Sequence, residues 1–244
     1  MTVAAYDRAV AALPSWPTAP GEIRLEEHDV HIWCASLDRF RDHRSQLDAA
    51  LSADERLRAS RFHFPEDRDR FMTSRGILRM LLGRYLQRNA ESIAFSVGRF
   101  GKPIIARPEG LGLSFSASRS GGLAVYAMTC TGPIGVDVER YSEIPDFEAI
   151  AARYFALDDL RRLMAVRRDR RREECFACWT RMEALVKASG EGIGGGRGTC
   201  PSSEWQLHTV RPAAGYVAAV ACRHEDARLS LWSVSKESLC TSQS

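Results

Sequence analysis

Short segments of strand length, separated by glycine-bearing turns, are the feature that most limits what this chain can fold into. In each half of the sequence they occur beside longer segments with helical periodicity. We therefore predict an α+β fold of two similar, pseudo-twofold subdomains, each a small, mainly antiparallel sheet with packed helices. Thr131-Gly132-Pro133 marks the expected boundary between residues 1–132 and residues 133–244. A cleft is expected between the two subdomains.

Two local signals place the helices of the first half. Ser52-Ala53-Asp54-Glu55 matches a capping box and predicts a short helix. Pro65 predicts the start of a longer helix, which ends near Asn89. In the second half, helices are expected at residues 147–155, 157–168 and 173–188. Strands are expected at residues 30–34, 93–97, 103–106, 113–117, 123–128, 134–139, 205–209, 216–221 and 229–233.

The composition excludes several classes of protein. With 244 residues, 45% of them hydrophobic and 27% charged, the chain is neither disordered nor collagen-like. Its apolar runs fall far short of the roughly 18 residues that a membrane helix needs, and its first residues lack the pattern of a secretory signal. Seven cysteines without framework spacing fit a reduced, cytoplasmic protein. The formal charge of +3 is too small to indicate nucleic acid binding by itself.

Two carboxylates alternate with valines in Gly135-Val136-Asp137-Val138-Glu139. In a strand, the valines would face the core, and Asp137 and Glu139 would share the opposite face with Cα atoms roughly 6.6 Å apart. Such a pair suits Mg²⁺, which completes its shell with phosphate oxygens and water. The alternative is an exposed strand face that carries two solvated acids.

The helix expected at residues 173–188 carries a second polar group. Trp179, Glu183 and Lys187 follow one another at intervals of four residues, so that Glu183 and Lys187 share one side about a turn apart. A third carboxylate beside an ammonium suits phosphate chemistry, in which one group binds metal or accepts a proton and the other balances charge on phosphate oxygens. The alternative is an exposed ion pair worth about 0.3–0.5 kcal/mol.

Basic and hydroxyl groups of the first half offer an anion site. Gly101-Lys102-Pro103 places a lysine on a turn that enters a strand, and Ser116-Ala117-Ser118-Arg119-Ser120-Gly121 ends another strand. Both segments contain groups that suit phosphate, although each alone is also an ordinary turn sequence. A formal GxGxxG match at residues 190–195 does not predict dinucleotide binding, because a helix precedes it and no helix follows.

Together these residues resemble the signature of the Sfp-type 4'-phosphopantetheinyl transferases. The resemblance rests on residues 135–139, followed by Trp179-x-x-x-Glu183-x-x-x-Lys187-Ala188-x-Gly190-x-Gly192. Upstream, Gly101-Lys102-Pro103 and the segment from Phe115 to Gly121 occur where that family carries its GKP and N-x-S-H-S elements. The resemblance covers roughly residues 50 to 195, and the combined pattern is far more specific than any of its parts.

The resemblance implies transfer of 4'-phosphopantetheine from coenzyme A to a serine of an acyl, peptidyl or aryl carrier protein, with release of adenosine 3',5'-bisphosphate. Such carriers serve fatty acid, polyketide or nonribosomal peptide biosynthesis. The family is one of pseudo-twofold α+β monomers with coenzyme A between the halves. Residues 1–132 would then supply the adenosine and phosphate contacts, and residues 133–244 the magnesium carboxylates and the catalytic helix.

The resemblance also implies residue roles by position. Asp137, Glu139 and Glu183 would hold Mg²⁺ on the pyrophosphate. Glu183 would also take the proton of the carrier serine, either directly or through water, and Lys187 would stabilise the phosphates and assist the leaving group. Coenzyme A contacts are expected from the following residues: Lys102, Pro103, Ser118 and Arg119, with Arg58 and Arg75 as further candidates for its 3'-phosphate.

The sequence departs from the family pattern at two positions. Arg119 stands where the family usually has histidine, and Ser116 where it usually has asparagine. Arginine keeps a positive donor for phosphate, but it cannot change its protonation near neutral pH as histidine can. Phosphate binding at Arg119 is therefore expected, and an acid–base role is not.

An arginine-rich run at residues 161–172 leaves an alternative function open. It holds seven arginines, and a basic nucleic-acid-binding module would use them to contact RNA or DNA. They also fit a solvated helix face, or a docking surface for an acidic carrier protein, which the resemblance favours over nucleic acid. The expected partners are therefore coenzyme A and a carrier protein, with neither nucleic acid nor a membrane.

Overall fold

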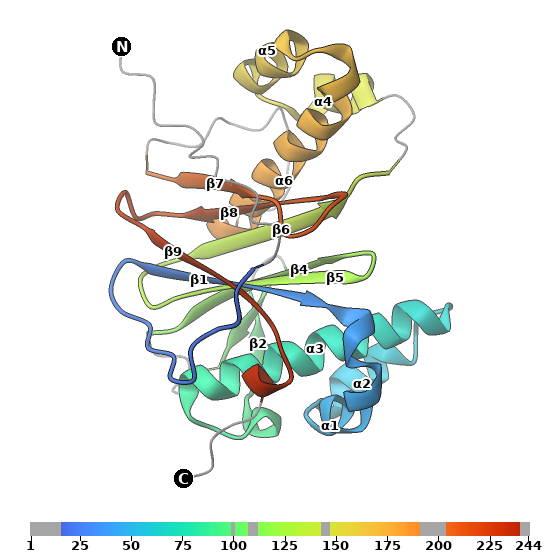
Figure 1. Ribbon diagram of the computed structural model, residues 1–244, viewed down its shortest axis with the longest axis vertical. Helices are drawn as coiled ribbons and strands as arrows, with labels where there is room; N and C mark the ends of the chain where they lie inside the picture. The colour runs from blue at the N-terminus through green and yellow to red at the C-terminus, as the bar shows by residue number, and fades with distance from the viewer. Residues whose placement is uncertain (1–15, 99–100, 107–111, 143–146, 191–203, 240–244) are drawn as a thin grey trace.

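The chain folds into four layers, in which two β-sheets pack face to face and helices cover both outer faces (Figure 1). The computed structural model describes residues 16–98, 101–106, 112–142, 147–190 and 204–239. The first sheet has the strand order β4-β5-β1-β9, the second has the order β6-β8-β7, and β2 and β3 form a separate hairpin. The α+β class is confirmed, and so are the small sheets, which are antiparallel except for the pair β1 and β9.

The elements follow the sequence signals closely. The α-helices are α1 (Arg44–Ala49), α2 (Ala53–Ala59), α3 (Pro65–Leu86), α4 (Phe147–Tyr154), α5 (Leu157–Ala165) and α6 (Arg171–Ser189), and short 3-10 helices occupy Leu37–His43, Ala90–Ser92, Arg168–Arg170 and Glu237–Leu239. The strands are β1 (Asp29–Ser36), β2 (Phe95–Val97), β3 (Pro103–Ile105), β4 (Ser114–Ser120), β5 (Leu123–Thr129), β6 (Ile134–Arg140), β7 (Gln206–Val210), β8 (Tyr216–Cys222) and β9 (Arg228–Ser233).

Each interface between layers has its own apolar core. The first sheet packs against α3 through side chains such as Trp33, Tyr126 and Leu78, all of them fully buried. The two sheets pack against each other through alternating residues of β1, β5, β6 and β8, which include Ile32 and Val136. Because both of their faces are covered, the inner strands β5 and β8 are apolar nearly throughout.

Strand β9 returns to the first sheet, where it lies parallel to β1. The expected boundary at residue 132 assigns this strand to the second subdomain, so the first sheet draws on both segments of the sequence. A parallel neighbour needs a long crossover connection, and no local turn signal marks it in the sequence. The pairing of β9 with β1 therefore joins the last described strand of the chain to the first.

Helix α6 lies directly against strand β6, and Gly135 permits the close approach. A Cβ atom at Gly135 would overlap the carbonyl oxygen of Ala184 and lie 2.5 Å from the amide nitrogen of Ala188. Gly135 shares its strand face with Asp137 and Glu139, so this face of β6 is the one turned toward α6. Within the described chain, no helix combines the length and the apolar character needed to cross a membrane.

Candidate active site

The site forms where the edge strands of the two sheets lie next to each other. Strand β4 is an edge of the first sheet and β6 an edge of the second. Three alternate serines of β4, which we call the serine ladder (Ser116, Ser118 and Ser120), bond to β6 with their hydroxyl groups. Side chains therefore join the two halves along this seam.

Each hydroxyl of the serine ladder has its own partner on β6. Ser116 Oγ accepts the backbone N–H of Val136 at 3.0 Å. Ser118 donates to Asp137 Oδ1 and Ser120 donates to Glu139 Oε2, both at 2.8 Å. The first half of the chain thus orients both carboxylates of the Asp-Val-Glu motif.

The serine segment ends a strand as expected, but the structure moves the end of that strand from Ala117 to Ser120. Strand β4 was expected at residues 113–117 but continues to Ser120. Its later serines bond to β6 at period two, so they extend the strand, and the turn follows at Gly121, whose φ of 54° suits glycine. Ser118 and Arg119 are consequently strand residues that point to opposite faces.

Helix α6 brings the second half of the expected cluster to the same place. Lys187 Nζ lies 2.6 Å from Asp137 Oδ1 and 3.1 Å from Ser118 Oγ. Glu183, one turn earlier on α6, is half-buried and interacts electrostatically with both Asp137 and Lys187. The structure therefore places all four predicted catalytic and metal residues, Asp137, Glu139, Glu183 and Lys187, around the contact between β6 and α6.

The carboxylates of this cluster influence each other's proton affinity. Burial raises the pKa of Glu183 above its ordinary value, and the charge of Asp137 raises it further, whereas Lys187 opposes the shift. Burial also raises the pKa of Glu139, against the hydrogen bond from Ser120. A glutamate whose pKa is raised toward neutrality is a better proton acceptor for a hydroxyl group than an ordinary surface carboxylate.

The donor set of the cluster fits a hard divalent cation. The Asp137 side chain is only 5% exposed, and its Oδ2 atom is buried without a hydrogen-bond partner. A buried carboxylate oxygen without a partner is costly unless a cation or a donor reaches it. As the described side chains lie, no group of three or more His, Cys, Asp or Glu residues is arranged to hold a metal ion. The acids are therefore neighbours and do not form a complete metal shell by themselves.

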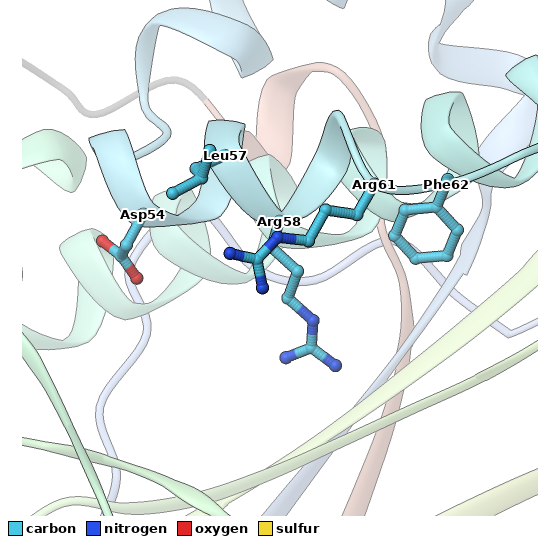
Figure 2. A pocket seen from close by; sticks show the side chains of 5 residues that line it. All are labelled: Asp54, Leu57, Arg58, Arg61 and Phe62. Carbon is cyan, nitrogen blue, oxygen red and sulfur yellow. The ribbon is translucent and has the colours of Figure 1, made fainter.

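A pocket of about 470 Å³ lies along α2 and the turn that follows it, and it is lined by Asp54, Leu57, Arg58, Arg61 and Phe62. Two of these five side chains are arginines and one is acidic, so we call it the basic pocket. In Figure 2, Arg58 of α2 and Arg61 of the turn after it extend toward the same open space, and the ring of Phe62 lies beside Arg61. The Arg119 guanidinium lies 5.7 Å from the centre of that ring. Because Arg119 follows Ser118 in β4, one strand connects this basic pocket to the acidic cluster.

The remaining predicted coenzyme A residues lie outside this pocket. Arg75 is bound to Glu55 and stacks over the ring of Phe95 at 5.0 Å. Lys102 directs its ammonium group to two backbone carbonyls of the second half, and Pro103 begins β3. Arg58 thus lines the pocket and Arg119 lies against Phe62, whereas Arg75 and Lys102 do not line the pocket. The roles of all four toward coenzyme A stay predictions.

Sequence reasoning missed some residues that the structure adds to the site. Ser116 was noted as a departure from a family pattern, and Ser120 was not singled out, yet both bond to β6. Their alternation with Ser118 was the available signal, since period two places all three on one strand face. Arg61 and Phe62 gave no signal in the sequence, because only the fold brings the end of α2 near β4.

The arginine-rich run at residues 161–172 spans the end of α5 and the start of α6. Several of its arginines pair with neighbouring acids at the surface, as Arg161 does with Asp158 and Arg167 with Asp169. This arrangement is that of a solvated, charge-balanced surface. No observation favours the alternative of a nucleic-acid-binding module. The GxGxxG match extends beyond residue 190 and lies outside the described residues.

Comparisons with known proteins point to a single family for both halves of the chain. Residues 133–241 match the family described as the 4'-phosphopantetheinyl transferase superfamily, and residues 33–131 match the one described as 4'-phosphopantetheinyl transferase, N-terminal. The 4'-phosphopantetheinyl transferase HetI of Nostoc sp. is 38% identical over 180 residues, which cover 73% of this chain and 76% of HetI. The 4'-phosphopantetheinyl transferases ffp of Bacillus subtilis and psf-1 of Bacillus pumilus are 29% and 30% identical over 148 residues, which cover 61% of this chain and 64% and 61% of those proteins.

Proposed function

This chain belongs to the 4'-phosphopantetheinyl transferase superfamily, whose members transfer phosphopantetheine from coenzyme A to carrier proteins, and we propose that it does so in a magnesium-dependent reaction that releases adenosine 3',5'-bisphosphate. The observation that supports this most is the cluster at β6 and α6. There the buried Asp137 keeps one oxygen without a partner while Lys187 holds the other. A carboxylate so placed, beside Glu139 and Glu183, has the oxygen ligands that Mg²⁺ prefers.

The cluster supplies what transfer to a serine needs. The hydroxyl oxygen of the carrier serine bonds to the β-phosphorus of coenzyme A, and the bond from that phosphorus to the bridging oxygen breaks. Glu183, with its raised pKa, takes the proton of the hydroxyl group. Lys187, one turn after Glu183 on α6, contacts Asp137 and balances the negative charge on the phosphate oxygens. Asp137, Glu139 and Glu183 would hold Mg²⁺, whose positive charge would offset the negative charge of the diphosphate.

In this proposal the first segment of the chain binds coenzyme A and the second segment supplies the catalytic residues. Residues 1–132 contribute the basic pocket, in which Arg58 and Arg119 hold the 3'-phosphate end of coenzyme A. Residues 133–244 contribute the carboxylates and Lys187. The attacking nucleophile belongs to the carrier protein, so the enzyme needs none of its own. We expect the chain to act as a monomer, because both segments of the site lie on one chain.

Intact-mass measurement tests the reaction itself. Apo forms of acyl, peptidyl and aryl carrier proteins are incubated with the protein, coenzyme A and Mg²⁺. A mass gain equal to one phosphopantetheine is expected on at least one carrier and not on a carrier whose acceptor serine is replaced by alanine. The proposal fails if the folded protein leaves every carrier at its apo mass.

Exchange of Arg119 for histidine is expected to make coenzyme A binding sensitive to pH. Although burial lowers the pKa of Arg119, arginine stays charged well above neutral pH, whereas histidine loses its charge above about pH 6.5. The KM for coenzyme A of the Arg119→His variant should therefore approach that of the wild type near pH 5.5. At pH 8.5 it should be about tenfold higher than that of the wild type, equivalent to about 1.4 kcal/mol.

Initial rates at varied coenzyme A concentration give these KM values, with Arg41→His as the matched control. Arg41 is exposed and lies outside both the pocket and the cluster. An equal pH dependence in the wild type and both variants would show that Arg119 does not contact the coenzyme A phosphates.

A further inference from the structure

Lys102 makes two contacts that tie the first half of the chain to the second. Its Nζ atom donates to the carbonyl oxygen of Ile134 at 2.6 Å and to that of Lys187 at 2.9 Å. Lys102 lies in the turn between β2 and β3, and Gly98 fixes this turn by donating its N–H to the carbonyl oxygen of Lys102 at 2.9 Å. The ammonium group is therefore held at a defined place.

Both carbonyls belong to the elements that form the acidic cluster. Ile134 is the first residue of β6, directly before Gly135, where β6 and α6 come closest. Lys187 is in the last turn of α6, where carbonyl groups have no partner within the helix. A cation at a helix C-terminus also interacts favourably with the helix dipole. Lys102 thus caps α6 from the other half of the molecule.

The contact with Lys187 connects Lys102 to the site by a single residue. The backbone of Lys187 accepts from Lys102, and its side chain contacts Asp137 and Ser118. A shift of this turn of the helix would move the Lys187 ammonium relative to Asp137, and Glu183 with it. Effects of this kind matter because small misplacements of catalytic groups cost large factors in rate.

Lysine is rare in this chain, yet a lysine occupies position 102, where the contact with α6 is made. The sequence contains three lysines, Lys102, Lys187 and Lys236, among 34 basic residues, and two of the three meet here. An ammonium is a compact donor that can serve two carbonyls from one point, whereas guanidinium presents a planar fork. Burial and the nearby Lys187 lower the pKa of Lys102 to about 8, so it remains mostly charged at neutral pH.

We propose that Lys102 is a positioning residue for phosphopantetheine transfer, because it fixes the last turn of α6 against the start of β6 and so sets Lys187 and Glu183 relative to Asp137. This inference rests on the proposed function and adds to it a role that differs from a coenzyme A contact. Lys102 does not line the basic pocket at α2, and both of its hydrogen bonds go to backbone carbonyls.

Steady-state kinetics with Lys102→Met and Lys102→Arg separate the two roles. Methionine keeps the length but has no donor, so kcat should fall about tenfold while the KM for coenzyme A stays within twofold of the wild type. Arginine keeps N–H donors and charge, so kcat should recover to within about threefold. Circular dichroism must show each variant folded at the assay temperature, so that a loss of stability alone is not read as a loss of turnover.

Hydrogen–deuterium exchange gives a readout that needs no activity. In Lys102→Met, amide exchange should rise in peptides from the last turns of α6 and stay unchanged in α3. Lys236→Met is the matched control, since Lys236 is exposed and directly precedes the 3-10 helix at Glu237–Leu239, which contacts α3, and it should change neither exchange in α6 nor the kinetics. If Lys102→Met does not fold, Lys102→Gln, which keeps an N–H donor without charge, should show a smaller fall in kcat and the same unchanged KM.

A rise in the KM for coenzyme A with kcat unchanged would overturn the proposal in favour of a ligand contact. Unchanged kinetics and exchange in a folded variant would also overturn it. A wild-type protein that modifies no carrier would contradict the proposed function instead, while the exchange result would still report on the contact between Lys102 and α6.

Discussion

Asp137→Asn is expected to lower the rate of phosphopantetheine transfer about a thousandfold, equivalent to about 4 kcal/mol in the barrier, while the fold stays intact. Asparagine has nearly the same shape, so Ser118 can still donate to the side-chain oxygen. The negative charge that pairs with Lys187 and leaves Oδ2 available to a cation is lost, however. The change therefore removes the negative charge of the side chain at position 137 but keeps the hydrogen bond that positions this side chain.

Single-turnover rates on an apo-carrier, together with circular dichroism, measure this effect. Asp226→Asn is the matched control, because Asp226 is exposed in the loop between β8 and β9 and far along the chain from the cluster. It should transfer at the wild-type rate. Transfer by a folded Asp137→Asn variant within tenfold of the wild-type rate would remove Asp137 from the reaction.

Gly135→Ala is expected to reduce the free energy of unfolding by about 3 kcal/mol and to suppress transfer as well. The added methyl group would overlap the Ala184 carbonyl oxygen and press on the Ala188 amide nitrogen, both of which are backbone atoms that cannot turn aside. Helix α6 would have to move away from β6, and Glu183 and Lys187 would move with it. Stability and activity are therefore coupled at this glycine.

Urea unfolding followed by circular dichroism measures the change in stability. The matched control is Gly21→Ala, since a Cβ atom there would meet nothing within 4 Å and the backbone is not in the left-handed region. Equal unfolding midpoints for the two variants would show that α6 does not sit on β6 as described.

Local chemistry explains which parts of the fold were predictable from the sequence. The capping box at Ser52 and Glu55 and the proline at residue 65 mark helix starts that depend on neighbouring residues alone, and α2 and α3 begin there. The alternation around Asp137 predicted which side chains face the core, because strand period does not depend on the partner strand. Each of these signals depends only on a few residues that are adjacent in the sequence.

The contacts between distant segments could not be predicted in the same way. Nothing near residue 228 indicates that β9 will pair with β1, and nothing near Lys102 indicates that its ammonium will reach the end of α6. The 3-10 helix at Leu37–His43 and α1 were also not predicted. The serine ladder lies between these cases, since its period was visible in the sequence but its partner strand was not.

The site residues also divide into those that local motifs predicted and those that only the fold brings together. Asp137, Glu139, Glu183 and Lys187 were chosen from two motifs, and the structure brings those motifs to one contact between strand and helix. The basic pocket required the fold, because Phe62, which follows α2, and Arg119 of β4 meet only after folding. Family resemblance supplied Arg58, which lines that pocket, and also Arg75, which does not line it and is bound to Glu55.

Calorimetric titration of Mg²⁺ into the protein, in the presence of coenzyme A, tests the central claim most directly. The wild type should bind one ion per chain, and Asp137→Asn and Glu183→Gln should each weaken that binding at least tenfold, because a strand and a helix share the ion. Undiminished binding in the Glu183→Gln variant, or no binding by the wild type, would contradict the account.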